Sequence, residues 1–200
     1  KKVRAYTDMY EDAIKLMKSK DLAAFDLSQE KEGLRGRYGR NPFGQGCLLA
    51  RRLLENGVRY AEVTFGGWDT HNANFVRVPD QAKTLDNALS TLLKDLETKG
   101  MLEDTLVVLA TEFGRTPVIN VNEGRDHHPS CFTCVLAGGG VQGGRVLGET
   151  DETASMAVSD TIKVPDLNAT IGYALGLPLD EVVFSPSMRP FTMASKGQPV

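Results

Sequence analysis

The chain has 200 residues, with 23 lysines and arginines against 26 aspartates and glutamates, a formal net charge of −3 and a hydrophobic share of 41%. This length fits one domain or two, and the composition is ordinary for a globular protein. Because no run is rich in lysine and arginine, the sequence predicts no nucleic-acid partner. No apolar run approaches the ~20 residues that a membrane-spanning helix needs.

The chain begins with a charged, amphipathic segment, KKVRAYTDMYEDAIKLM, which lacks the apolar centre of a signal peptide. Position 1 is not a methionine, so we expect a fragment or a processed product. Apolar residues at helical spacing predict helices over residues 2–18, 43–56 and about 80–99. A fourth helix is predicted within PDLNATIGYALGLP (165–178), with Pro178 just beyond its end. Gly57, Gly100 and Gly176 are expected to end the last three, with Asp166 as the N-cap of the fourth. The polar connector after the first helix has room for a short helix from Ser28.

Three segments have the pattern of strands: VRYAEVTF (58–65), TLVVLATEF (105–113) and CFTCVLAGG (131–139). The second is a nearly continuous apolar run, as in a central strand buried on both faces. Strands alternating with helices predict a single α/β domain over residues 1–200, with three layers and a mostly parallel sheet flanked by helices. Glycines in LAGGGVQGGRV open no helix, so we interpret that segment as a structural connection.

The three cysteines are an odd number, which argues against a disulfide framework. Cys131 and Cys134 form a C-x-x-C pair inside a predicted strand, with no second pair to complete a zinc site. Packing is the favoured interpretation, and redox or metal use is the alternative.

All three histidines follow aspartates in two glycine-flanked loops that come after predicted strands. Ligands of open α/β sheets bind beyond the carboxyl ends of strands, so these loops are expected to face one crevice. Carboxylate and imidazole together suit Zn, Mn or Fe. The candidate metal ligands are Asp69, His71, Glu112, Asp126, His127 and His128. Arg115 or Arg125 could hold a phosphate or sulfate in a bidentate grip.

Each residue also has a structural interpretation. Asp69 could be a turn residue beside a surface histidine, Glu112 could pair with Arg115, and the adjacent histidines could be loop residues. Trp68 could line the site or belong to the core. The joint pattern favours a shared polar site, because ionisable groups clustered in a crevice tend to be functional.

Several stretches resemble a bacterial family of unknown function, numbered 1501 among such domains and described as sulfatase-like. They include RYGRNPFGQGCLLARRLLENGVRY, GGWDTHNANF, LATEFGRTPVIN, GRDHHPSCFTCVLAGGGVQGGRVLGETDE and VPDLNATIGYALGLP, and they cover nearly the whole chain. The resemblance implies the C-terminal half of a longer protein that is exported, with a periplasmic location suspected.

That family in turn is similar to the alkaline phosphatase and sulfatase superfamily, which implies an alkaline-phosphatase-like fold that this chain covers in part. The superfamily's acidic turn usually provides an Asp and a His ligand, whereas here Glu112 is followed by Phe113, which cannot bind a metal. The resemblance places the catalytic nucleophile upstream of these residues, so none is assigned here.

The resemblance implies a metal-dependent hydrolase that acts on a small anionic phosphate or sulfate ester. The alternative is a non-catalytic binding or scaffold protein on a degenerate sulfatase-like fold, since fold does not settle function. A third interpretation is a stable fragment with purely structural loops. The sequence predicts no oligomeric state.

Overall fold

The computed structural model describes residues 2–200, which divide into two compact units. The first unit holds the described residues up to Trp68 together with Pro79–Lys94, and the second holds Asp69–Val78 and Asp95–Val200. None of the helices in these residues combines the length and apolar character needed to cross a membrane. A single domain over residues 1–200 stays a prediction.

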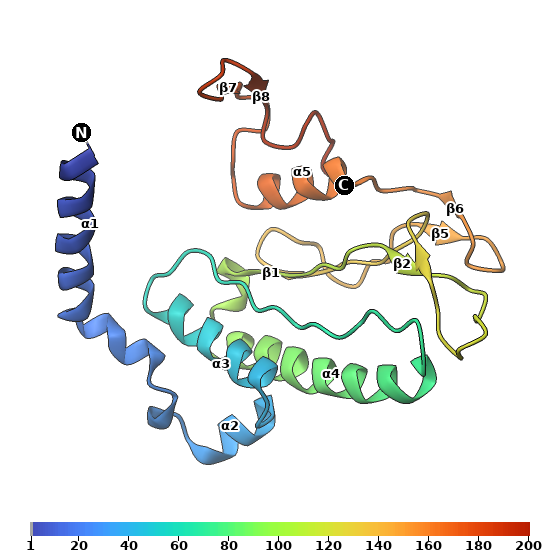
Figure 1. Ribbon diagram of the computed structural model, residues 1–200, viewed down its shortest axis with the longest axis horizontal. Coiled ribbons are helices and arrows are strands. Elements are labelled where there is room, and N and C mark those ends of the chain that lie inside the picture. Colours follow the sequence, from blue (N-terminus) through green and yellow to red (C-terminus); the bar gives the residue numbers. More distant parts are fainter. Residues whose placement is uncertain (1) are drawn as a thin grey trace. The chain divides into compact units, whose positions relative to one another are not determined.

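The first unit begins with α1 (Lys2–Met17), which confirms the first predicted helix (Figure 1). Its apolar face is exposed, however, with Tyr6, Met9, Tyr10, Ile14 and Met17 all open to solvent. Two short 3-10 helices follow, at Lys20–Phe25 and at Leu27–Gln29, and then comes α2 (Glu32–Tyr38).

Helix α3 (Pro42–Glu55) confirms the second predicted helix. The side chain of Asn41 caps its start by accepting a hydrogen bond from the Gly44 N–H at 2.9 Å, and Pro42 fits the first turn because no N–H is needed there. Gly57 follows the helix with a φ of +83°, as expected for a residue that ends it.

The core of the first unit is formed by α2, α3 and the part of helix α4 (Asn74–Thr98) that belongs to this unit. Its most buried members are Tyr38, Cys47, Leu48 and Ala88. Partly buried apolar side chains surround them, namely Leu27, Leu34, Phe43, Val63 and Leu92.

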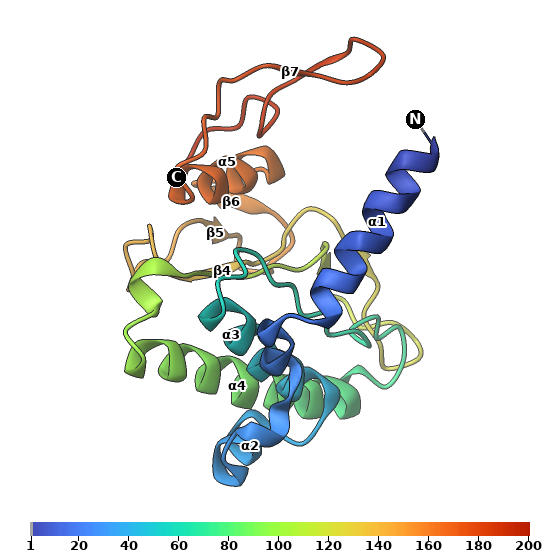
Figure 2. The same cartoon turned by 90° about the vertical axis from the view of Figure 1, so that its left-hand side faces the viewer.

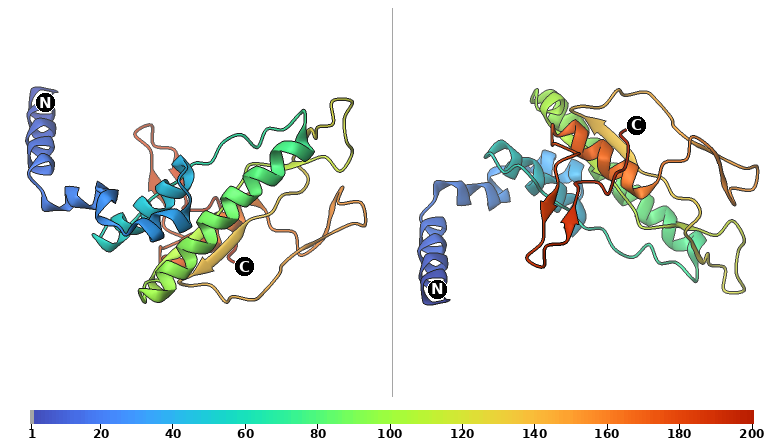
Figure 3. Two further views of the ribbon diagram at one scale, coloured as in Figure 1. Left: turned by 90° about the horizontal axis from the view of Figure 1, so that it is seen from below. Right: turned by 90° about the horizontal axis from the view of Figure 1, so that it is seen from above.

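Helix α4 (Asn74–Thr98) begins earlier than the predicted residue 80, which is a correction. The helix continues through Pro79, although proline lacks the N–H that a helix interior uses. Hydrogen bonds to a neighbouring loop stabilise the extra turn, because Ala73 N–H donates to Asn122 O at 3.2 Å and Asn74 N–H donates to Glu123 O at 3.0 Å. Figure 3 shows the resulting length of α4, which ends before Gly100 as predicted.

Residues 58–65 are predicted as a strand, but they form an irregular segment without strand pairing in the described part of the chain. The prediction is wrong for this structure. A strand is defined by its hydrogen bonds to a neighbouring strand, and alternating apolar residues alone do not supply one.

The strands of the second unit pair two by two, in four small antiparallel sheets among the described residues. The longest pair joins β1 (Leu106–Leu109) to β4 (Val135–Gly138), both shorter than the predicted strands over 105–113 and 131–139. The other strands are β2 (Gly114–Arg115), β3 (His127–His128), β5 (Glu149–Thr150), β6 (Ala157–Ser159), β7 (Val183–Phe184) and β8 (Pro190–Phe191). The three-layer, mostly parallel sheet stays a prediction.

Helix α5 (Val164–Ala174) confirms the fourth predicted helix and ends before Gly176, whose φ is +69°. Asp166 is not its N-cap, because the helix starts two residues earlier with Pro165 in its first turn. The Asp166 carboxylate instead accepts hydrogen bonds from the backbone N–H of Lys163 at 3.0 Å and of Gln198 at 2.9 Å.

The end of α5 lies against the turn that follows β4, where a Cβ on Gly140 would come within 2.8 Å of the Ala174 Cβ (Figure 3). A long loop then leads from α5 to the β7–β8 hairpin (Figure 2).

Candidate metal centre

The segment that holds Asp69 and His71 has no regular secondary structure and bends at His71, and the residue between them is buried. Thr70 is only 1% exposed, and its hydroxyl donates to the Asn74 side-chain oxygen at 2.6 Å. On either side of this buried residue, Asp69 Oδ1 and His71 Nε2 lie 3.0 Å apart. The local sequence therefore presents one carboxylate and one imidazole as a pair.

A two-residue ladder between β2 and β3 adds the third member of the cluster. Arg115 lies opposite His127 in this antiparallel pair, and Gly114 lies opposite His128. Alternation along β3 separates the adjacent histidines, because His127 turns toward Asp69 while His128 Nε2 lies 2.9 Å from the backbone oxygen of Ser155.

Three ligand atoms converge in a nearly equilateral triangle. The Asp69 Oδ1 atom lies 3.0 Å from His71 Nε2 and 3.1 Å from His127 Nε2, and the two Nε2 atoms are 3.1 Å apart. Imidazole nitrogen and carboxylate oxygen bind a divalent ion such as zinc at about 2.1 Å, so one ion could be held by all three residues.

Arg115 lies against the carboxylate of Asp69. Its side chain is 17% exposed and donates to Asp69 Oδ1 at 2.7 Å and to Glu112 Oε1 at 3.2 Å. Hydrogen bonds from Arg115 first, and then from His127, hold the pKa of Asp69 below its usual value. The carboxylate of Asp69 therefore stays ionised to a lower pH than a free aspartate does.

Asp126 contacts the opposite edge of the His71 ring, with its Oδ1 atom 2.7 Å from His71 Nδ1. The hydrogen bond from His71, followed by one from Asn120, lowers the pKa of Asp126. An ionised carboxylate only accepts hydrogen bonds, so the proton of this contact lies on Nδ1. This arrangement leaves the Nε2 lone pair of His71 directed at the triangle, as in many histidine metal ligands.

Arg125 is engaged in the structure of its own loop. Its Nη1 atom donates to the backbone oxygens of Thr116 at 2.7 Å and Pro117 at 2.6 Å, and its guanidinium group lies 5.7 Å from the centre of the Phe75 ring. These contacts close the loop between β2 and β3. An anion-binding role for Arg125 stays a prediction that these contacts do not support.

Of the six predicted ligands, the structure brings Asp69, His71 and His127 into one group that could hold an ion. The others contact different partners: Asp126 contacts His71 from its far edge, Glu112 contacts Arg115, and His128 contacts Ser155. Their roles as ligands stay predictions.

Sequence reasoning missed Asn120, which donates to both the His71 backbone oxygen and the Asp126 carboxylate. A weak signal was present, because asparagine side chains in turns often accept a hydrogen bond from the backbone two residues on, as Asn120 does from Asn122.

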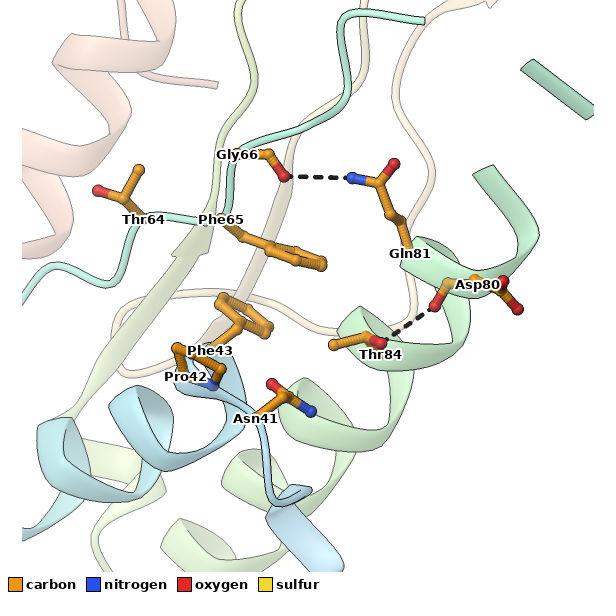
Figure 4. A pocket seen from close by; sticks show the side chains of 9 residues that line it. All are labelled: Asn41, Pro42, Phe43, Thr64, Phe65, Gly66, Asp80, Gln81 and Thr84. Carbon is orange, nitrogen blue, oxygen red and sulfur yellow. Dashed lines mark hydrogen bonds between the residues drawn. The ribbon is translucent and has the colours of Figure 1, made fainter. Parts of the chain in front are cut away.

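An open hollow of about 430 Å³ lies in the first unit, away from these residues in the sequence (Figure 4). Its floor is the stacked pair Phe43 and Phe65, whose ring centres are 4.4 Å apart. Trp68 meets Phe65 edge-on at 5.5 Å, which gives the only tryptophan a packing role. The thiol of Cys47 is buried, which raises its pKa to about 11, while Cys131 and Cys134 are half-buried free thiols.

The chain belongs to a family described as "Protein of unknown function (DUF1501)", whose model matches residues 1–200. No curated protein and no solved structure matches the chain. The resemblance to the family is therefore confirmed. The link to sulfatases and the correspondence to a C-terminal half stay predictions.

Proposed function

We propose that the protein is a metal-dependent hydrolase of phosphate or sulfate esters, with Asp69, His71 and His127 as its metal ligands. The observation that carries this proposal is the triangle of one carboxylate oxygen and two imidazole nitrogens, with edges of 3.0–3.1 Å. Two imidazoles and one carboxylate suit Zn, Mn or Fe better than Mg or Ca, which prefer oxygen ligands.

Three protein ligands are typical of catalytic sites, whereas structural zinc sites usually have four. When bound, a divalent ion of this kind polarises an ester oxygen and activates an attacking water or hydroxyl group. The remaining residues of the site prepare the ligands. Arg115 donates a hydrogen bond to Asp69, and Asp126 holds the proton of His71 on the side away from the triangle.

The predicted anion-binding role of Arg115 needs a change of partner. Both of its terminal nitrogens already donate to carboxylates, at Asp69 and at Glu112. The Glu112 contact is longer, at 3.2 Å, and that carboxylate is largely exposed. We therefore expect an anionic ester to displace Glu112 from Arg115, while Asp69 stays in place.

The test is hydrolysis of para-nitrophenyl phosphate and para-nitrophenyl sulfate by the natural protein. We expect chelation to abolish turnover, a divalent ion to restore it, and His127→Gln to lower it by about 100-fold or more. His128→Gln is the matched control, because its ring lies outside the triangle. Turnover that survives both chelation and His127→Gln would contradict the proposal.

A second candidate function is metal binding without catalysis. It is favoured by Phe113, which follows Glu112 where the resemblance to the superfamily implies a second ligand. The ring centre of Phe113 lies 4.5 Å from that of His127. Stoichiometric metal binding together with no turnover of any ester in a broad screen would support this candidate over the hydrolase.

A further inference from the structure

Asn120 connects the two chain segments that form the site. Its Nδ2 atom donates to the His71 backbone oxygen at 3.0 Å and to Asp126 Oδ1 at 3.1 Å. Its Oδ1 atom accepts from the backbone N–H groups of Asn122 at 2.9 Å and of Gly124 at 3.0 Å. The Nδ2 end of Asn120 thus faces two acceptors, and its Oδ1 end faces two donors. This pattern determines the orientation of the amide, because a flipped amide would place oxygen against acceptors and nitrogen against donors at all four contacts.

The close packing around Asn120 makes this connection specific. Gly124 lies directly against the backbone of His71 and Asn72, where a Cβ would overlap the His71 carbonyl group. The backbone of the loop at Gly124 and the backbone of His71 are therefore in direct contact, with no room for a side chain between them. Within that contact, the Asn120 amide is the donor that satisfies both the His71 carbonyl and the Asp126 carboxylate.

The position of Asp126 decides which nitrogen of His71 carries the proton. A free neutral histidine can carry it on either ring nitrogen. With Asp126 Oδ1 at 2.7 Å from Nδ1, the proton on that nitrogen gains a charge-assisted hydrogen bond. The Nε2 atom is then an acceptor, 3.0 Å from Asp69 Oδ1 and 3.1 Å from His127 Nε2. Its lone pair therefore faces the other two atoms of the group that could hold a metal ion.

We propose that Asn120 is a positioning residue that acts through Asp126, so that His71 carries its proton on Nδ1 and directs its Nε2 lone pair at Asp69 and His127. This inference rests on the proposed function, because the direction of the Nε2 lone pair matters only if His71 binds a metal ion. The tautomer itself can be measured on the metal-free chain, so the two proposals can fail separately.

The experiment is a long-range proton–nitrogen NMR correlation of the imidazole rings in the metal-free 200-residue chain. It is recorded at about pH 9, where free imidazole is neutral. We expect His71 to carry its proton on Nδ1. In Asn120→Asp, the new carboxylate can still accept from Asn122 and Gly124 but repels Asp126, so a rise in the Nε2-protonated form of His71 is expected.

Asn122→Asp is the matched control, because it adds the same charge two residues away. The hydrogen bonds of Asn122 with Asn120 and Ala73 involve only its backbone, so they do not depend on its side chain. It should keep the tautomer of the unaltered chain. A second variant, Asp126→Asn, removes the charged acceptor without changing Asn120. We expect it also to raise the Nε2-protonated form of His71. It keeps the proposal testable if Asn120→Asp does not fold.

Zinc affinity measured on the same proteins adds a second readout. Loss of a residue that orients a metal-bound histidine typically weakens binding by about 10–100-fold, and we expect a loss in that range for Asn120→Asp but not for Asn122→Asp. The proposal is overturned if His71 of the unaltered chain carries its proton on Nε2, or if either Asn120→Asp or Asp126→Asn folds and leaves it on Nδ1. If the chain binds no zinc but shows the expected tautomers, the proposed metal site is refuted and the positioning role of Asn120 is supported.

Discussion

Arg115 and His127 occupy opposing positions of the β2–β3 ladder, and both contact the same oxygen of Asp69, at 2.7 Å and 3.1 Å. The backbone pairing of two short strands therefore brings a cation and an imidazole to one carboxylate. Because the ladder is only two residues long, side chains and close backbone contacts in the adjoining loop must maintain it.

The pKa of Asp69 is lowered first by its hydrogen bond from Arg115. A folded-state pKa below the usual value of about 3.9 means that the carboxylate stabilises the fold above that pH, and that this contribution is lost as the pH falls through the lower folded value. We expect Arg115→Gln to raise the pKa of Asp69 toward its usual value. Carbon NMR of the Asp69 carboxyl group during an acid titration measures the midpoint, and an unchanged midpoint would show that Arg115 is not the cause.

Gly124 should tolerate no side chain. In Gly124→Ala the new Cβ would overlap the carbonyl group of His71, so the loop and the His71 segment must move apart. We expect destabilisation of about 1–3 kcal/mol in urea unfolding, together with weaker metal binding. Gly143→Ala is the control, because a Cβ there meets nothing within 4 Å. Equal stability of the two variants would refute the close contact.

Metal binding should stabilise the folded chain. An ion that binds only the folded form adds about 2.7 kcal/mol when its free concentration is 100 times the dissociation constant. Thermal unfolding with and without zinc should therefore show a higher midpoint with zinc, and Asp69→Asn should lose most of that shift. A shift of the same size in Asp69→Asn would place the zinc elsewhere.

The three cysteines should differ in reactivity. Burial raises the pKa of the Cys47 thiol to about 11, and the thiolate is the reactive form. At pH 8 in the folded chain, we expect Cys47 to react with a thiol reagent at least ~10-fold more slowly than Cys131 and Cys134, which are half-buried. Mass spectrometry after timed labelling identifies each site. Labelling of all three at one rate would contradict the buried position of Cys47.

Local sequence patterns predicted the helices well. Residues 2–18 and 43–56 form helices within a residue or so of their predicted ends, and Gly100 and Gly176 follow the next two as expected. Caps and periodicity are local signals, so no knowledge of the tertiary structure is needed. The start of α4 could not be predicted, since loop residues near 122 stabilise the turn that precedes Pro79.

Strands were harder to predict, because a strand depends on a partner that its own sequence does not identify. Residues 58–65 alternate as a strand should, yet the described structure leaves them unpaired. The residue types of the candidate site were predictable from the clustering of histidine and aspartate. Which of the two adjacent histidines faces Asp69 was not, because that choice follows from the register of Arg115 opposite His127.

The most direct test of the metal centre is the zinc, manganese and iron content of the purified chain, measured by elemental mass spectrometry after loading with each ion and removal of the excess. We predict about one ion per chain, lost in His127→Gln and retained in His128→Gln, because only His127 contributes its Nε2 atom to the triangle. A chain that retains no ion, or that loses it equally in both variants, would contradict a centre built on Asp69, His71 and His127.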